Sequence, residues 1–157
     1  MNAPRFWLTI AGLLGALGVG LGAYGAHGLE KRVRAVATAA PSVDAADKQS
    51  SGIASSVEAD VARRIDNWKT AVHYQMTHVA ALLAIGLASA RWPMRRWCFA
   101  GAAMLAGMVM FSGMLYYEAL APERRLGIVV MFGGISYIVG WLLLAWAGLG
   151  IPKGERT

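Results

Sequence analysis

The stretch VHYQMTHVAALLAIGLASA, residues 72–90, contains no charged side chain and is long enough for a helix to cross a bilayer, which takes about 20 residues. Its head, HYQMTH at residues 73–78, nevertheless carries two histidines, a tyrosine and a glutamine. Such polar groups are costly in hydrocarbon unless they find partners. The stretch therefore predicts a membrane-spanning helix and a polar cluster that needs an explanation.

Three further apolar runs of similar length lie at residues 6–26, 97–117 and 126–149. The chain is 57% hydrophobic and 15% charged, against roughly 25% charged residues in an ordinary soluble domain. We therefore predict an all-α fold, an integral membrane four-helix bundle that forms one domain over residues 1–157 and ends in a polar tail at 150–157. The first run exceeds the ~7 to 15 residues of a signal-peptide core, which favours a retained span over a cleaved leader.

The segment between the first two runs, residues 30–66, has a centre, TAAPSVDAADKQSSGIASS, without periodicity. This composition predicts a flexible loop. The end of the segment differs, because Ser55 and Glu58 have the spacing of a capping box. Apolar residues then recur at helical spacing, at Val57, Val61, Ile65 and Trp68. We predict a short amphipathic helix that lies on the membrane interface before the second span.

The formal net charge is +6, but the Lys and Arg residues lie in short connections and flanks and form no single basic face. We therefore expect the positive side chains to face the surface of the lipid bilayer, and we do not expect nucleic acid as a partner. Nine of the fifteen Lys and Arg residues fall on the side of the long loop, and this count favours a cytoplasmic loop. We expect the protein in the inner, or plasma, membrane of a bacterium.

The connectivity places most of the polar side chains of the apolar runs in one leaflet. Short connections at residues 91–96 and 118–125 make the second, third and fourth runs antiparallel neighbours. The end of the first run, the start of the second, the end of the third and the start of the fourth therefore share one side. The candidate binding or polar-network residues on that side are His27, His73, Tyr74, Gln75, His78, Ser112 and Tyr116.

Gln75 and His78 share one helix face, whereas His73 lies about 140° around the helix from His78. Ser112 and Tyr116 have the same depth on the neighbouring run. We predict hydrogen bonds between these two pairs, with His78 neutral, because an unpaired imidazolium at this depth is costly. In this interpretation the side chains hold helices together and bind neither a metal nor a cofactor.

Two other interpretations of the cluster stay open. Haem binding by two histidines takes imidazoles from facing helices, and His27 has a depth that suits His73. Alternatively, the cluster lines a polar cavity of a small carrier or ligand-binding protein for a proton, a quinone or another small molecule. A Soret band identifies the first alternative and a void among the side chains the second.

Glycine recurs in the first run at steps of three and four, which aligns Gly15, Gly18, Gly22 and Gly25 on one helix face. Such a face lets another backbone approach closely, and close packing is the main association force between helices in lipid. The candidate facing groove on the fourth run consists of Gly133, Gly134 and Gly140. We predict that the first and fourth runs pack together at the centre. Self-association or association with other membrane proteins through glycine faces is a second candidate interaction.

Several separated blocks of the sequence match one family. The first is GAHGL at residues 25–29, and the second is W-x-TAV-x-YQM-x-H, which comprises Trp68, Thr70 to Val72, Tyr74 to Met76 and His78. The third is FSG-x-LY, which comprises Phe111 to Gly113, Leu115 and Tyr116. The fourth, in the last run, comprises Gly133, Gly134, Gly140 and Trp141. Together they resemble the domain of unknown function 423 family, small four-span membrane proteins related to transmembrane protein 256. The resemblance covers nearly all of the chain outside about 31–66, and it implies a fold and a membrane location without a reaction. Met114 and the pair Val130 and Met131 depart from the family pattern, so we expect a straighter entry into the fourth run.

No enzyme motif accompanies the polar cluster. The sequence contains no GxSxG, no HExxH and no phosphate-binding glycine loop, so we do not expect an enzyme. We predict a non-enzymatic accessory or scaffold subunit of a larger membrane assembly. A polar cluster whose side chains bond to one another favours the accessory or scaffold function. A void within the cluster favours a carrier.

Overall fold

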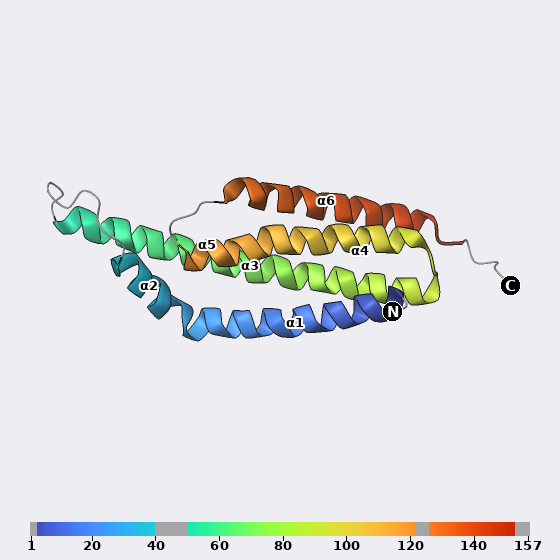
Figure 1. The fold of residues 1–157 in the computed structure, drawn as a ribbon, viewed down its shortest axis with the longest axis horizontal. Coiled ribbons are helices and arrows are strands. Elements are labelled where there is room, and N and C mark those ends of the chain that lie inside the picture. Colours follow the sequence, from blue (N-terminus) through green and yellow to red (C-terminus); the bar gives the residue numbers. More distant parts are fainter. Residues whose placement is uncertain (1–2, 40–49, 122–125, 153–157) are drawn as a thin grey trace.

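The computed structural model describes residues 3–39, 50–121 and 126–152. The elements in these ranges are all helices (Figure 1): α1 (Ala3–His27), α2 (Leu29–Ala39), α3 (Ser50–Arg91), α4 (Arg95–Gly107), η1 (Met108–Gly113), α5 (Met114–Leu120) and α6 (Gly127–Leu149). Within these ranges four stretches are long and apolar enough to cross a membrane: Ala3–His27, Ser55–Arg91, Arg95–Leu120 and Gly127–Leu149. The predicted all-α class with four spans is therefore confirmed. Apolar runs of this length form helices because a helix satisfies its own backbone groups in lipid.

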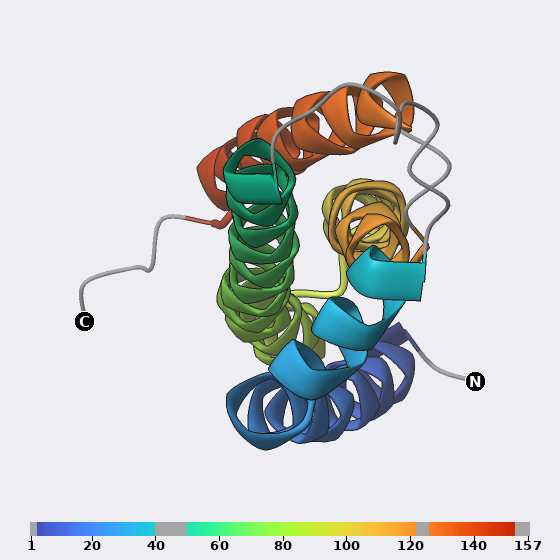
Figure 2. The ribbon, with the colours of Figure 1, turned by 90° about the vertical axis from the view of Figure 1, so that its left-hand side faces the viewer.

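The second and third spans, α3 and the continuous segment α4–η1–α5, form a central antiparallel pair. Helices α1 and α6 lie on opposite sides of this pair (Figure 2). Helix α1 packs mainly on α3, and α6 packs mainly on α4 and η1. The predicted central packing of the first run against the fourth is therefore wrong, because both outer helices turn their glycines toward the central pair.

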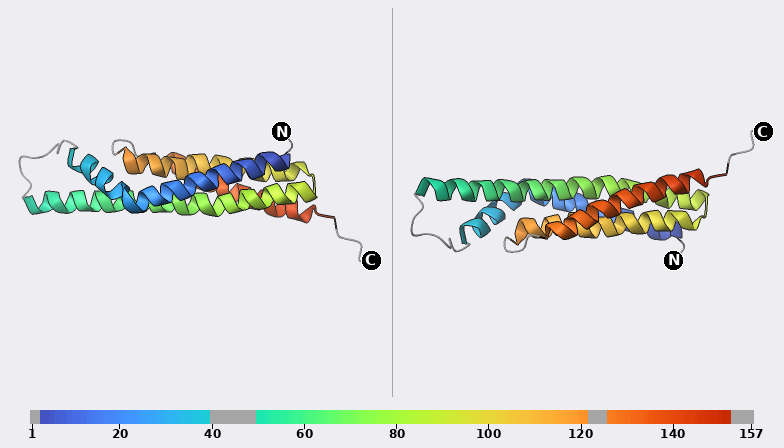
Figure 3. Two further views of the ribbon diagram at one scale, coloured as in Figure 1. Left: turned by 90° about the horizontal axis from the view of Figure 1, so that it is seen from below. Right: turned by 90° about the horizontal axis from the view of Figure 1, so that it is seen from above.

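Both outer helices cross the central pair at an angle (Figure 3). The start of α1 reaches α4, where the Trp7 ring packs so closely on Gly101 that an added β-carbon would lie 2.7 Å from it. Helix α6 starts over α5 and slants toward α3 along its length (Figure 3). Because of this angle, the N-terminal end of α6 is separated from α3.

The glycine face of α1 is the surface that contacts α3. A β-carbon added at Gly18 would lie 2.6 Å from Met76 Sδ, and one at Gly25 would lie 2.8 Å from the Trp68 ring. At Gly15 and Gly22, the two other glycines of this face, the nearest atoms would be 3.4 and 3.6 Å away. The close approach of α1 to α3 therefore depends most on Gly18 and Gly25.

The glycines of α6 face the third span in the same way. A β-carbon added at Gly133 would lie 2.5 Å from the backbone nitrogen of Phe111, and one at Gly140 would lie 2.7 Å from Met104 Cγ. At Gly134 the nearest atom, in the Phe111 ring, would be 3.9 Å away. Gly133 and Gly140 are thus the contact glycines of α6, and Gly134 has room beside it.

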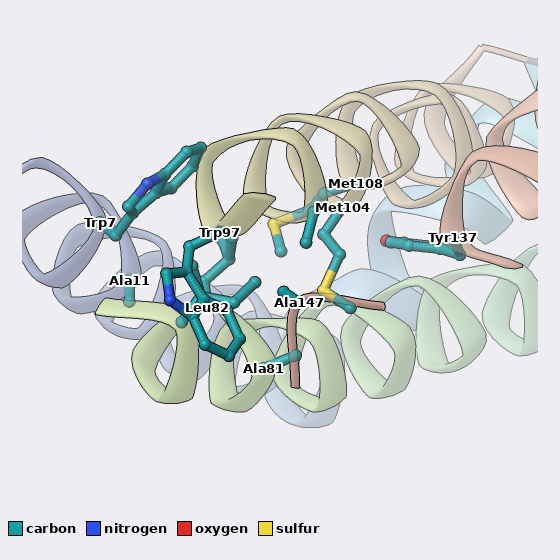
Figure 4. Packing of buried hydrophobic residues seen from close by; sticks show 11 residues of the cluster. Trp7, Ala11, Ala81, Leu82, Trp97, Met104, Met108, Tyr137 and Ala147 are labelled. Carbon is teal, nitrogen blue, oxygen red and sulfur yellow. The ribbon is translucent and has the colours of Figure 1, made fainter. Parts of the chain in front are cut away.

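The main apolar core lies between α1, α3, α4 and α6 (Figure 4). Leu82 and Ile85 of α3 and Met104 of α4 are fully buried in it. Lipid is as apolar as these side chains, so their contacts contribute through dispersion and fit more than through the exclusion of water.

The predicted loop over residues 30–66 is wrong for its described part. Helix α2 forms the first part and the N-terminal end of α3 forms the last part, while residues 40–49 lie outside the described residues. Leu29 and Val33 of α2 are buried against Val61 of α3 in a second apolar core. Each segment has a short apolar face that becomes stable only when the other segment covers it.

The predicted short helix on the membrane interface is wrong as well. Helix α3 runs without a break from Ser50 to Arg91, so the amphipathic segment continues the second span in a straight line. Ser55 lies inside the helix and does not cap its start. The apolar face that begins at Val57 is covered by α2 instead of lipid headgroups.

The ends of the fourth span agree with the predicted boundaries within one residue. Helix α6 is uninterrupted from Gly127, in line with the expected straight entry. The polar tail is described as far as Pro152 and is not helical there, and residues 153–157 lie outside the described residues.

Candidate functional site

The structure separates the seven candidate residues by burial. Gln75, His78 and Ser112 are buried, and Tyr116 is partly buried. His27, His73 and Tyr74 are exposed on the helix surface. The buried members bond to other helices and the exposed members do not, so the seven do not form a single cluster.

Gln75 connects three helices through its side-chain amide. Its Nε2 donates to the backbone oxygen of Leu14 in α1 at 2.8 Å, and its Oε1 accepts from the Tyr116 hydroxyl of α5 at 2.9 Å. We call Gln75, Tyr116 and the Leu14 carbonyl the Gln75 cluster. An amide suits this position because it donates and accepts at once.

The glycine face of α1 makes the Gln75 cluster possible. A β-carbon at Gly18 would lie 3.1 Å from Gln75 Nε2, so the bare backbone gives the amide access to the helix. The same arrangement recurs two turns away, where Trp68 Nε1 donates to the Leu21 oxygen at 2.9 Å beside Gly25. The glycine stripe thus exposes the carbonyl groups of α1 to donors on α3 as well as allowing close packing.

His78 uses both of its ring nitrogens. Its Nδ1 lies 2.7 Å from the backbone oxygen of Tyr74, and Trp141 Nε1 of α6 donates to its Nε2 at 3.2 Å. A carbonyl only accepts and an indole only donates, so Nδ1 carries the hydrogen and Nε2 carries none. This bonding pattern is that of the neutral ring that the sequence predicts. It leaves neither nitrogen free to bind a metal.

Tyr137 of α6 completes the surroundings of His78. The two rings stack with centroids 3.5 Å apart and planes at 16°, and the Tyr137 hydroxyl lies 3.3 Å from Ser112 Oγ. A β-carbon at Gly107 would lie 2.6 Å from the Tyr137 ring, so this glycine makes the space for it. We call His78, Tyr137, Trp141 and Ser112 the His78 cluster.

The two clusters differ from the predicted network in one respect. Gln75 and Tyr116 bond as expected, but His78 and Ser112 bond to the fourth span instead of to each other's helices. Ser112 lies in the π-helical segment η1 and Tyr116 lies in α5, and the wider i→i+5 turns of η1 change the direction of the residues that follow. The two residues, four apart, therefore contact different neighbours.

Tyr137 was not singled out in the sequence, and Trp141 was named there only as part of the family pattern, without a role in the polar network. The available signal was their i,i+4 spacing inside an apolar run, where a hydroxyl and an indole N–H both need partners. That signal identifies two donors on one helix face, but it does not show which helix receives them.

The buried part of the bundle contains no unused polar side chain among the described residues. Every buried side-chain nitrogen and oxygen there has a hydrogen-bond partner. The buried polar side chains thus bond to one another and to the backbone, and the spaces next to them are open grooves on the helix surface, of about 410 Å³ beside Gln75 and Tyr116 and about 480 Å³ beside His78 and Tyr137. This arrangement fixes helix positions, and neither of these two spaces is an enclosed chamber.

Comparison with known proteins matches this architecture to one family. The family described as "Protein of unknown function (DUF423)" matches residues 21–134, most of the chain, including Gln75, His78 and Tyr116. The chain belongs to the DUF423 family. It is 34% identical over 146 residues to a UPF0382 membrane protein of Staphylococcus epidermidis, a match that covers 92% of this chain and 96% of that relative.

Two other organisms carry similar DUF423 relatives. The UPF0382 inner membrane protein YgdD of Escherichia coli is 32% identical over 142 residues, which cover 89% of this chain and 86% of YgdD. A UPF0382 membrane protein of Schizosaccharomyces pombe is 31% identical over 138 residues, with 85% and 92% covered. No solved structure matches the chain. The four spans and the names of these relatives identify this DUF423 protein as a multi-span integral membrane protein.

Proposed function

We propose that this DUF423 protein is a non-enzymatic scaffold subunit that holds a rigid helical hairpin beyond one face of the membrane. The observation that carries the proposal is the length of α3, whose 42 residues span about 63 Å at ~1.5 Å per residue. The hydrocarbon core of a bilayer is about 30 Å thick, so roughly half of α3 extends outside it. Because the Escherichia coli relative is named an inner membrane protein, we propose the same membrane for this chain.

The hairpin, defined as α2 and residues 50–69 of α3, is fixed to the bundle. Arg64 is 2% exposed, its Nε lies 2.6 Å from Asp60, and its guanidinium donates to the Ala119 oxygen at the end of α5. Arg34 of α2 binds Glu58 of α3 at 2.7 Å. These contacts hold the hairpin in a fixed position as a continuation of the bundle. A docking element needs such a fixed position.

The closed polar clusters support a scaffold over a carrier. A carrier needs polar groups that exchange partners with a substrate, whereas the buried polar side chains of the described residues already have partners in the protein. The His78 ring, the strongest candidate for a moving proton, has both nitrogens bonded.

Site-specific photocrosslinking in native membranes tests the scaffold function. A photoreactive residue replaces the exposed Lys31 of α2 or Ala62 of α3, and the control position is the lipid-facing Leu142 of α6. We expect a protein adduct of discrete mass from the two hairpin positions and none from Leu142. The same adduct is expected to disappear when the exposed Arg32 of α2 is changed to Glu.

Proteoliposomes provide the second measurement. Liposomes that contain the protein are expected to hold a pH gradient as long as protein-free liposomes do. A leak that the Gln75→Leu variant removes identifies a proton carrier and contradicts the scaffold. Lipid adducts alone at both hairpin positions also contradict it.

A further inference from the structure

A lateral groove lies between α3 and α6, on the side where α6 slants away from α3 (Figure 3). Its volume of about 480 Å³ falls within the ~300 to 1,000 Å³ of small-molecule sites. His73, Tyr74, Phe111, Gly134, Tyr137 and Trp141 line it. The groove opens toward lipid, so a ligand that reaches it comes from the bilayer.

The wall of the groove is a continuous set of aromatic rings. The Tyr74 ring lies 4.6 Å from that of Phe111 and 6.1 Å from that of Tyr137, measured between centroids. Trp141 is 46% exposed and lies inside the apolar run of α6, about 21 Å from its start and about 12 Å from its end at ~1.5 Å per residue, so it is at neither end of the span. Tryptophans usually lie at membrane interfaces, where the indole meets polar groups. This wall therefore provides flat surfaces for stacking on the exposed side of the bundle.

Two polar groups of the groove have no hydrogen-bond partner among the described residues. They are the Tyr74 hydroxyl and the His73 imidazole, both on the exposed face of α3. By contrast, the adjacent His78 and Tyr137 are bonded within the protein. An unpaired donor in hydrocarbon is costly, so these two groups are available to a ligand that brings acceptors.

We propose that this groove binds the ring of a membrane-soluble quinone. A quinone ring is flat, its carbonyl oxygens accept hydrogen bonds from Tyr74 and His73, and its apolar tail stays in the lipid through which it arrives. None of the described residues that line the groove is Lys or Arg, so the groove has no cation for a lipid phosphate. The groove between α1 and α3 differs, because Lys69 lines it. This ligand site is independent of the proposed scaffold function.

Photolabelling of the full-length protein in nanodiscs tests the site. An azidoquinone is the probe and decylubiquinone is the competitor, and labelled peptides are mapped by mass spectrometry. We expect saturable labelling of α3 and α6 at the groove that decylubiquinone suppresses. Tyr74→Phe removes the hydroxyl and keeps the ring, so the half-saturating concentration should rise about tenfold for the loss of one hydrogen bond.

The matched control is Tyr117→Phe. Tyr117 on α5 is 45% exposed and has no hydrogen-bond partner among the described residues, so it resembles Tyr74 outside the groove. This variant should label like the wild type, and Gly134→Leu, which fills the groove, should abolish specific labelling. Labelling that rises linearly and resists competition overturns the proposal. Equal half-saturation in Tyr74→Phe and Tyr117→Phe overturns it as well.

Discussion

Substituting Gly133 by Ala should destabilise the bundle, whereas the same change at the adjacent Gly134 should not. A β-carbon at Gly133 would lie 2.5 Å from the backbone nitrogen of Phe111 and 2.7 Å from the carbonyl carbon of Met110. Both are backbone atoms and cannot rotate away, so α6 must move about 1 Å outward to restore ordinary contact. A gap of ~0.5 to 1 Å forfeits a quarter to a half of the dispersion attraction, and overpacking typically costs ~1 to 3 kcal/mol.

The control at Gly134 isolates this contact. Both substitutions replace Gly by Ala in one helix, so the gain in helix propensity of about 1 kcal/mol is shared and cancels in the difference. Gly133→Ala should therefore be less stable than Gly134→Ala by ~1 to 3 kcal/mol. The assay is unfolding by SDS in detergent micelles, followed by tryptophan fluorescence. Equal stability of the two variants refutes the argument that α6 docks on η1 through the bare backbone of Gly133.

The remaining predictions concern the polar clusters, the hairpin and the orientation. His78→Ala should cost ~1 to 3 kcal/mol more than His73→Ala in the same SDS assay, because only His78 is buried and bonded; a larger loss at His73 contradicts the assignment of the clusters. Trp141→Phe should lower stability by ~0.5 to 2 kcal/mol, since it leaves His78 Nε2 without its donor; an unchanged unfolding midpoint shows that this bond contributes nothing. Arg34→Glu should increase the distance between spin labels on α2 and α3, and adding Glu58→Arg should restore the original distance, because the charge swap rebuilds the ion pair. A distance that is the same in the wild type, the single variant and the double variant rejects a role for the pair. Reporter fusions in the α2–α3 connection and at the C-terminus should show a cytoplasmic hairpin, as the excess of Lys and Arg predicts; activity of the periplasmic reporter in the connection reverses the orientation.

The spans could be predicted from the sequence because bilayer thickness sets a length that is visible in one dimension. Residues 72–90, for example, are uncharged over the length that the hydrocarbon core requires, and the structure places them within α3. The bond between Gln75 and Tyr116 follows in the same way, since a short connection fixes which ends of two spans have equal depth. These predictions need length, polarity and connectivity only.

The hairpin could not be predicted because its stability comes from a contact between two weak segments. Neither α2 nor the start of α3 has a long apolar run, and Leu29 and Val33 are ordinary residues until Val61 covers them. The apolar face of α3 was visible at helical spacing, but the sequence does not say whether lipid or another helix covers such a face. The apolar face of α3 was therefore predicted correctly, but the prediction covered it with the membrane interface instead of α2.

The pairing of helices could not be predicted for a related reason. A glycine stripe shows where a backbone is able to approach, and it carries no information about which helix approaches. Gly18 accommodates Gln75 of α3, and Gly133 accommodates the backbone at Phe111. Tyr137 was missed as a result, because its role depends on the position of α6 beside His78.

The segment HYQMTH can now be understood from the position of α3 between two outer helices. In lipid the association of helices gains little from apolar burial, so directional bonds have a larger share in choosing partners. Gln75 provides such bonds toward α1 and α5, and His78 provides them toward α6. Because α1 and α6 lie on opposite sides of the central pair, one turn of α3 positions both outer helices (Figure 2). The side chains of the adjacent His73 and Tyr74 have no part in these bonds between helices, and their exposure on the groove is what leaves them available to a ligand from the membrane.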